Sequence, residues 1–170
     1  MPRAKLIKVL NLWFEAMGGA IADGGGEILK FMGDGLLAVF PMDGDPAATC
    51  DRAVAAAQVA QAQTRALAER LVAHGEEPLR CGLALHFGDV EFGNIGTATR
   101  LDFTVIGPAV NMARRLVGLT KELGHAVVAS REFAAATTAP LWSLGQHNVR
   151  GIAAPVAVYA LPADRVAGGP

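Results

Sequence analysis

The sequence predicts an α+β sandwich in which helices pack on one face of a largely antiparallel sheet. Long segments with apolar residues at helical spacing alternate with short apolar runs typical of strands. Turns that contain glycine and aspartate separate several of these runs, as in β-hairpins. No repeat and no long linker divides the chain, so we expect one domain over residues 1–162 and a flexible tail over residues 163–170.

Composition and charge exclude several classes of protein. The chain has 170 residues, 52% of them hydrophobic, and a mean hydropathy of +0.33, which together argue against disorder. No apolar run reaches the roughly 20 residues of a bilayer span. The net charge of −1 gives no basis for a nucleic-acid partner. Cys50 and Cys81 lie in apolar segments without metal-type spacing, so we expect buried free thiols in a cytoplasmic protein.

The first half of the chain is expected to form a helix, a hairpin and a second helix. Residues 6–22 carry apolar side chains at helical spacing, and the three glycines at 24–26 end that helix. Two apolar runs, 27–32 and 36–40, flank a Gly-Asp-Gly turn and predict a β-hairpin. The alanine-rich stretch 47–74 predicts a long helix that packs closely through its small residues.

The second half is expected to place strands around a further helix. Pro108 is expected to open a helix that ends near residue 123, because proline is pre-set for the first helical turn. Ser130 has the chemistry of an N-cap for a short helix. The expected strands lie at residues 79–87, 90–95, 101–106, 126–129, 142–149 and 155–161.

Asp34 and Lys30 are candidate site residues on the predicted hairpin. A carboxylate in a glycine-flanked turn is exposed and open to a ligand, which suits a hard cation such as Mg²⁺. Asp-Gly is also a common turn pair chosen for its backbone angles. Lys30 lies four residues before Asp34 in an otherwise apolar strand. The alternative reading is an edge-strand lysine that discourages aggregation.

Asn111 and Arg115 are the second candidate pair. They stand at i and i+4 of the predicted helix and therefore share a face. An amide beside a permanently charged guanidinium suits a phosphoryl group whose negative charge grows in a transition state. An ordinary solvated helix face would show the same pattern.

Three strings in order make the chain resemble the class III adenylate/guanylate cyclase catalytic domain. They are LKFMGDGLLAVF at residues 29–40, GLALHFGDV with GNIG at residues 82–96, and RLDFTVIGPAVN running into a pair of arginines at residues 100–115. The likeness extends over about residues 9–161. It implies a ferredoxin-like sandwich of the class III nucleotide cyclase type, with helices packed on a mainly antiparallel sheet.

The resemblance also implies a substrate. The family's purine-contacting pair falls on Lys30 and Thr104, and a Lys/Thr pair is similar to that of bacterial adenylate cyclases. The chemistry agrees, because lysine donates to adenine N1 while a hydroxyl accepts from the N6 amino group. The implied reaction converts ATP to 3′,5′-cyclic AMP and pyrophosphate, in intracellular signal transduction.

The remaining site residues follow from the same resemblance. Asp34 matches a metal carboxylate for Mg²⁺ or Mn²⁺, two ions per complete site. Asn111 would orient the ribose, Arg115 would stabilise charge on the α-phosphate, and Arg150 would hold the triphosphate. Such sites form between protomers, so the resemblance implies a head-to-tail homodimer with shared active sites.

One departure from the family concerns the start of the fold. The family's first helix follows a strand that carries another metal carboxylate and a phosphate-binding loop, whereas this chain opens on the helix at 6–22. We expect the first strand of the sandwich to be missing, with natural sequence upstream, and little cyclic AMP from these residues alone. A non-catalytic cyclase-like module for dimerisation or nucleotide binding is the alternative. A diguanylate cyclase would share the acidic hairpin but does not predict the Asn-Arg helix.

Overall fold

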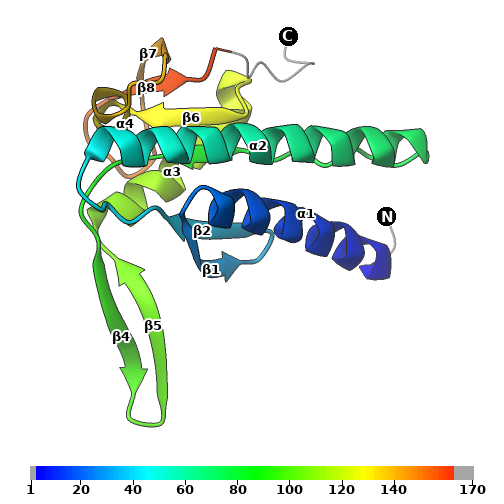
Figure 1. Ribbon diagram of the computed structural model, residues 1–170, viewed down its shortest axis with the longest axis horizontal. Coiled ribbons are helices and arrows are strands. Elements are labelled where there is room, and N and C mark those ends of the chain that lie inside the picture. The colour runs from blue at the N-terminus through cyan, green and yellow to red at the C-terminus, as the bar shows by residue number, and fades with distance from the viewer. Residues whose placement is uncertain (1–2, 163–170) are drawn as a thin grey trace.

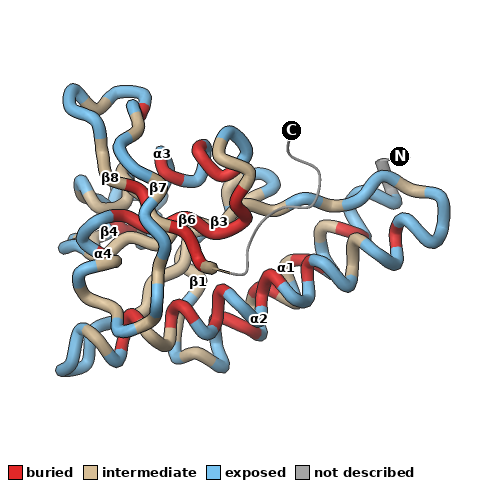
Figure 2. The backbone as a smooth tube through the Cα atoms, turned by 90° about the horizontal axis from the view of Figure 1, so that it is seen from above, coloured by how far each residue is buried: buried red, intermediate tan, exposed pale blue. Residues whose placement is uncertain are grey.

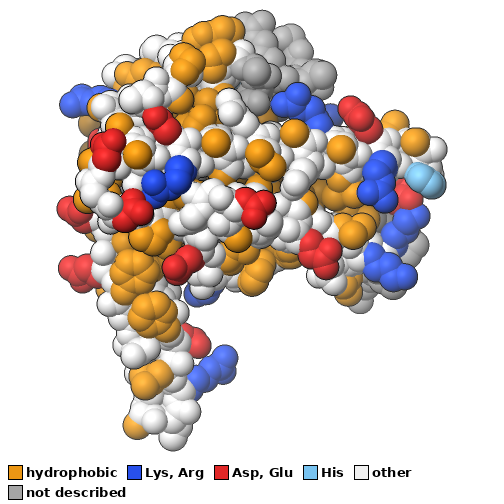
Figure 3. All heavy atoms as spheres, viewed as in Figure 1, with side chains coloured by type: hydrophobic (Ala, Val, Ile, Leu, Met, Phe, Trp, Pro, Cys, Tyr) orange, Lys and Arg blue, Asp and Glu red, His pale blue; other side chains and the backbone are white. Residues whose placement is uncertain are grey.

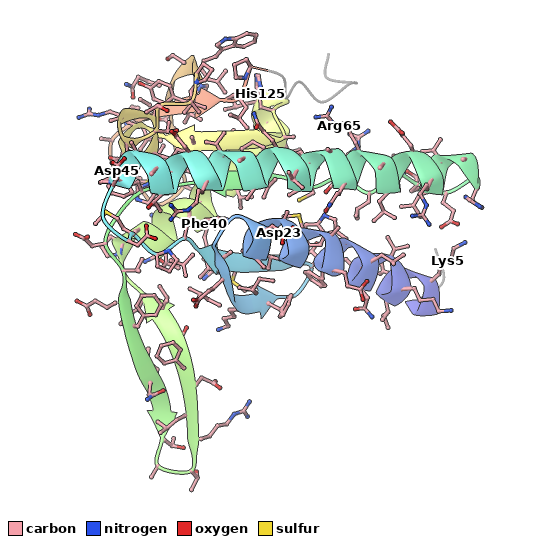
Figure 4. The ribbon with its side chains drawn as sticks, in the orientation of Figure 1. Lys5, Asp23, Phe40, Asp45, Arg65 and His125 are labelled. Atoms are coloured by element: carbon pink, nitrogen blue, oxygen red, sulfur yellow. The ribbon has the colours of Figure 1, made fainter. Side chains whose placement is uncertain are left out.

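Two long helices lie side by side and run in opposite directions in the computed structural model, which describes residues 3–162 (Figure 1). The predicted tail at 163–170 and the first two residues of the predicted domain lie outside the described residues. Helix α1 spans Arg3–Asp23 and α2 spans Pro46–Ala73, close to the predicted ranges. Asp45 caps α2 by accepting a hydrogen bond from the Ala47 N–H at 3.0 Å (Figure 4).

Small side chains bring the two helices together. Trp13, Met17 and Ala20 of α1 pack against Ala60 of α2 in one buried cluster. A hydrogen bond from Trp13 Nε1 to Thr64 Oγ1, at 3.2 Å, satisfies the one polar atom of the indole. The predicted close packing of the alanine-rich helix is therefore confirmed.

The strands form three separate hydrogen-bonded sheets. The first pairs β1 (Glu27–Met32) with β2 (Gly35–Val39), and the second pairs β4 (Glu91–Thr97) with β5 (Arg100–Ile106). The third has the order β3-β6-β8-β7, built from Leu83–Leu85, Val127–Ser130, Val156–Ala160 and Trp142–His147. Only β3 and β6 pair in parallel among the described strands, so the α+β class with mainly antiparallel pairing is confirmed.

The four-stranded sheet is covered by helices on both faces, whereas the sequence pattern predicts one covered face. Val127 and Ala129 of β6 face α2 and the short helix α4 (Arg131–Ala136). Val128, between them, faces α3, which spans Pro108–Leu123. Every residue of β6 is buried, which is typical of a strand enclosed on both sides (Figure 2). The sheet is the centre of the core.

Strand β3 is shorter than predicted. The alternation over 79–87 predicts a nine-residue strand, but only Leu83–Leu85 pair with β6. Among residues 3–162, one edge of β3 and one edge of β2 have no hydrogen-bonded neighbour. Leu36 of β2 and Leu83 of β3 both pack against the same α1–α2 cluster. Among the described residues, the β1–β2 hairpin and the main sheet are therefore linked through this shared cluster and not by strand pairing.

The β4–β5 hairpin projects from the body of the molecule as an arm (Figure 1). One face of the arm is apolar: Phe92, Leu101 and Phe103 are 50%, 60% and 63% exposed (Figure 3). The rings of Phe92 and Phe103 stack with centroids 5.9 Å apart. Separately, every helix among residues 3–162 is too short or too polar to cross a lipid bilayer.

Candidate functional site

A pocket of about 630 Å³ lies between α3 and the turn that follows β7. It contains three arginines and one glutamate, so its lining carries an excess of positive charge. Arg115 and Arg150, both candidates from the sequence, are brought together here. Its lining residues are Arg114, Arg115, Gly118, Leu119, Glu122, Asn148, Val149, Arg150 and Gly151.

A hydrogen bond fixes the guanidinium of Arg115 within this pocket. Arg115 Nη1 donates to the Gly151 carbonyl oxygen at 2.5 Å. The Ile152 N–H donates to the Val149 carbonyl at 3.0 Å and closes the turn that carries Arg150. Two cations 35 positions apart in sequence therefore reach one pocket, an arrangement suited to a chain of phosphates.

Asn111 shares helix α3 with Arg115 but does not line the pocket. It is exposed in the first helical turn, where its backbone N–H donates to the Gly107 carbonyl at 3.4 Å. The core-facing side of the helix is anchored, because Leu116 is fully buried and Met112 packs in the same cluster. The anchored face leaves Asn111 and Arg115 pointing away from the core.

Asp34 and Lys30 occupy the β1–β2 hairpin as predicted. Asp34 is exposed in the turn between the two strands, and Lys30 is exposed on β1 opposite Leu37. Thr104 is half-buried on β5, opposite Gly93. Strands β1 and β5 contact each other, so the two strands that carry Lys30 and Thr104 are neighbours. The arginine pocket includes none of these three side chains.

The chemistry of Asp34 fits one ligand of a divalent cation. Within residues 3–162, no three His, Cys, Asp or Glu side chains gather as a metal-binding cluster. Mg²⁺ in nucleotide sites takes one or two carboxylates and fills its other positions with phosphate oxygens and water. Asp34 is exposed and flanked by glycine, so it can serve as one such carboxylate.

Other reactive side chains are built into the structure rather than offered to a ligand. His86 Nδ1 lies 2.8 Å from Ser130 Oγ, and that oxygen also accepts from the Phe133 N–H at 3.1 Å, which confirms the predicted N-cap. Burial lowers the pKa of His86, and nearby Glu132 only partly opposes this. Burial raises the pKa of the Cys81 thiol to about 12 and also raises the pKa of Cys50, so both thiols are protonated.

Sequence reasoning missed Arg114, Asn148 and Gly151 at this site. Arg114 and Asn148 each neighbour a residue that was assigned, but nothing in their spacing shows that they line the same pocket. Gly151 has a detectable signal, because an Arg-Gly pair between two apolar strands is typical of a turn. Its contact with Arg115 depends on tertiary structure and has no sequence signal.

Comparison with curated proteins gives two informative relatives. An adenylate cyclase of Anabaena cylindrica is 36% identical over 127 residues, which make up 73% of this chain and 24% of that protein. An uncharacterised protein of Mycobacterium tuberculosis is 35% identical over 159 residues, 91% of this chain and 28% of that protein. The chain thus spans about a quarter of the length of these curated relatives. No protein-family model matches it.

Solved structures agree with the sequence comparison. The adenylyl cyclase CyaB from P. aeruginosa superposes with a TM-score of 0.81 at 26% identity, covering 99% of this chain and 88% of that one. The guanylyl cyclase Cya2 superposes with a TM-score of 0.78 at 28% identity, covering 94% of this chain and 81% of that one. Because the sequence comparison and the fold comparison both lead to nucleotide cyclases, the chain belongs to the class III adenylyl and guanylyl cyclase catalytic-domain family.

Proposed function

We propose that this chain is the catalytic domain of an adenylate cyclase that converts ATP to 3′,5′-cyclic AMP and pyrophosphate in the cytoplasm. The observation that carries the proposal is the pocket that is lined by both Arg115 of α3 and Arg150 of the turn after β7. Two cations that line one pocket match the polyphosphate of a nucleotide. Membership of the cyclase family supplies the reaction class.

The pocket residues would act on the phosphates and the ribose. Arg150 binds the triphosphate, and Arg115 stabilises the negative charge that grows on the α-phosphate as the ribose 3′-oxygen attacks it. Arg115 suits this role because a guanidinium stays charged throughout the reaction. Asn111, one helical turn before Arg115, orients the ribose.

Selection of adenine over guanine is assigned to Lys30 and Thr104. The lysine ammonium donates to adenine N1, and the threonine hydroxyl accepts from the N6 amino group. Guanine presents the opposite pattern, with a hydrogen on N1 and a carbonyl oxygen at C6, so the lysine would meet a donor. The contact between strands β1 and β5 supports a joint role for these two residues.

Asp34 is the residue of this chain that we assign to Mg²⁺ or Mn²⁺. In a two-metal mechanism, bound divalent cations would lower the pKa of the attacking hydroxyl and would neutralise charge on the phosphates. Asp34 contributes a fixed negative charge at the tip of an exposed hairpin, where ion and nucleotide can both approach.

A head-to-tail homodimer would complete the site. The arginine pocket does not include Asp34, which supports a metal carboxylate supplied by the second copy. The apolar face of the arm, with Phe92, Leu101 and Phe103, supports the same proposal because exposed patches of this kind are typical of association surfaces. The partners proposed for this chain are therefore ATP and a second copy of itself.

A non-catalytic cyclase-like module that binds nucleotide or dimerises is the second candidate. It is favoured because Asp34 is the single metal carboxylate that we assign among residues 3–162, whereas a two-metal mechanism uses more than one. The two candidates differ in turnover, because such a module binds ATP at the arginine pocket without forming cyclic AMP.

Arg115→Ala tests the catalytic proposal. In the full-length protein, we expect this change to lower kcat for cyclic AMP formation by about 100-fold or more, as for other transition-state hydrogen-bond donors. Lys121→Ala is the matched control, because Lys121 is an exposed cation on the same helix outside the pocket. Equal rates for the two variants, measured by chromatography of the nucleotide product, would remove Arg115 from the mechanism.

A further inference from the structure

Gly151 lines the arginine pocket, follows Arg150 in the chain and contacts Arg115. Arg150 precedes it in the turn closed by the Ile152-to-Val149 hydrogen bond, and its own carbonyl accepts from Arg115 Nη1 at 2.5 Å. Its φ angle is +79°, which a type II turn requires at its third residue and which glycine adopts at little cost. One residue thus shapes the turn that carries Arg150 and also binds Arg115 of α3.

The absence of a side chain at Gly151 leaves the space that the Arg115 guanidinium fills. A Cβ added at Gly151 would lie 2.9 Å from Arg115 Cζ, 2.9 Å from Nη2 and 3.0 Å from Nη1. These separations are well inside the roughly 3.5–4.0 Å at which carbon atoms make favourable contact. A side chain at this position would therefore displace the guanidinium. Since an arginine ends in a flexible tip, the charge would move while the fold stayed intact.

We propose that Gly151 is a positioning residue for Arg115. Its carbonyl and its missing side chain together hold the Arg115 guanidinium in the pocket that Arg150 also lines. The phosphate ligand rests on the proposed function, whereas the control of Arg115 by Gly151 follows from the local geometry. Gly151 touches no reacting atom and acts only through Arg115.

Gly145 provides a matched control. It lies in β7 with a φ angle of +82°, nearly that of Gly151, and nothing lies within 4 Å of a Cβ added there. Alanine at either position meets the same backbone strain. Only alanine at Gly151 also meets Arg115. A difference between Gly151→Ala and Gly145→Ala therefore reports the position of Arg115 rather than the backbone.

The position of the guanidinium can be followed directly by NMR. The Nε–Hε resonance of Arg115 is identified by its loss in Arg115→Ala. We expect this resonance to shift in Gly151→Ala and to stay in place in Gly145→Ala. A resonance that is unmoved in Gly151→Ala, or that moves equally in both variants, would overturn the proposal without reference to any nucleotide.

Binding of tripolyphosphate, measured by calorimetry, tests what the position does. Gly151→Ala should weaken binding about tenfold, comparable to the loss of one charge-assisted hydrogen bond, and Gly145→Ala should change it by less than about twofold. In an Arg115→Ala background, Gly151→Ala should add nothing. A further loss in that background would contradict action through Arg115. If the unmodified chain binds no tripolyphosphate, the proposed function and the phosphate role both fail, while the resonance still decides whether Gly151 positions Arg115.

Discussion

Asp51 is a single residue that fastens α2 to the segment after α4. It accepts hydrogen bonds from the hydroxyls of Thr137 and Thr138 and from the N–H groups of Thr138 and Ala139, the latter two at 2.8 and 3.3 Å. The Thr137 hydroxyl is the largest cause that lowers the pKa of Asp51, from an ordinary 3.8 to about 2. Because these bonds favour the ionised form, they stabilise the fold only while Asp51 is charged.

Asp51→Asn is expected to lower the free energy of unfolding by about 1 kcal/mol at neutral pH. A lowered native pKa stabilises the fold above the unfolded pKa of 3.8 and loses that effect as the pH falls through about 2. The difference in the free energy of unfolding between the parent and Asp51→Asn should therefore become smaller as the pH falls from about 4 to about 2. Urea denaturation across the acid range measures this difference in free energy. A difference that stays constant with pH would contradict the stabilising role of the Asp51 carboxylate.

At the level of single residues, the sequence is most informative where chemistry is local. The cap at Ser130 and the exposure of Asp34 follow from neighbouring residues and are found as predicted. The meeting of Arg115 with Gly151 depends on packing between α3 and a distant turn. No local pattern encodes such a contact. The roles of Lys30 and Thr104 remain predictions.

One buried polar contact links α1 directly to α2. Trp13 Nε1 donates to Thr64 Oγ1 at 3.2 Å, and Thr64 Oγ1 donates to the Ala60 carbonyl at 2.8 Å. Thr64→Val keeps the shape and removes the hydroxyl that accepts from the indole N–H, which should cost about 2 kcal/mol in the free energy of unfolding.

Thr64→Ser is the control for that change. It keeps the hydroxyl and removes one methyl group, so the expected loss is about 1 kcal/mol. Urea denaturation followed by circular dichroism compares the two. If the valine variant were as stable as the serine variant, the hydrogen bond between the helices would not contribute to the free energy of unfolding.

Helices with strong apolar periodicity were predicted well, whereas strands whose bounds depend on pairing with a neighbouring strand were predicted less well. Helices α1, α2 and α3 match their patterns within a few residues. The alternation over 79–87 is real in sequence, yet a strand also needs a neighbour, and only Leu83–Leu85 find one in β6. The run at 127–129 is apolar throughout, which is compatible with cover on both faces and does not reveal which helices supply it.

The molecule as a whole presents one exposed apolar arm. Phe103 is 63% exposed on the face of β5 that also carries Leu101, while Asp102 points to the other face because successive strand residues alternate. If this arm packs against a second copy, Phe103→Ser should weaken dimerisation by about tenfold or more. Light scattering over a concentration series measures the dissociation constant.

Asp102→Ser is the matched control for the arm. It introduces the same side chain one position away on the opposite face, and we expect the dimer to persist. A parent chain that is monomeric at every concentration, or a Phe103→Ser variant as dimeric as the parent, would reject the arm as the surface of association.

Base selection connects the arm with the β1–β2 hairpin, because Thr104 lies on β5 and Lys30 on β1. Lys30→Glu replaces a donor to adenine N1 with an acceptor that suits the guanine N1–H. We expect the ratio of cyclic AMP to cyclic GMP to fall when this variant is made in the full-length protein. An unaltered ratio would count against Lys30 as a base-reading residue.

In the most direct measurement, the full-length protein is incubated with equal concentrations of ATP and GTP and with Mn²⁺, and the cyclic product is identified by mass spectrometry. An adenylate cyclase whose base is read by Lys30 and Thr104 should form 3′,5′-cyclic AMP and pyrophosphate in large excess over cyclic GMP. Cyclic GMP as the main product, or nucleotide binding at the arginine pocket without any cyclic product, would contradict the proposed function.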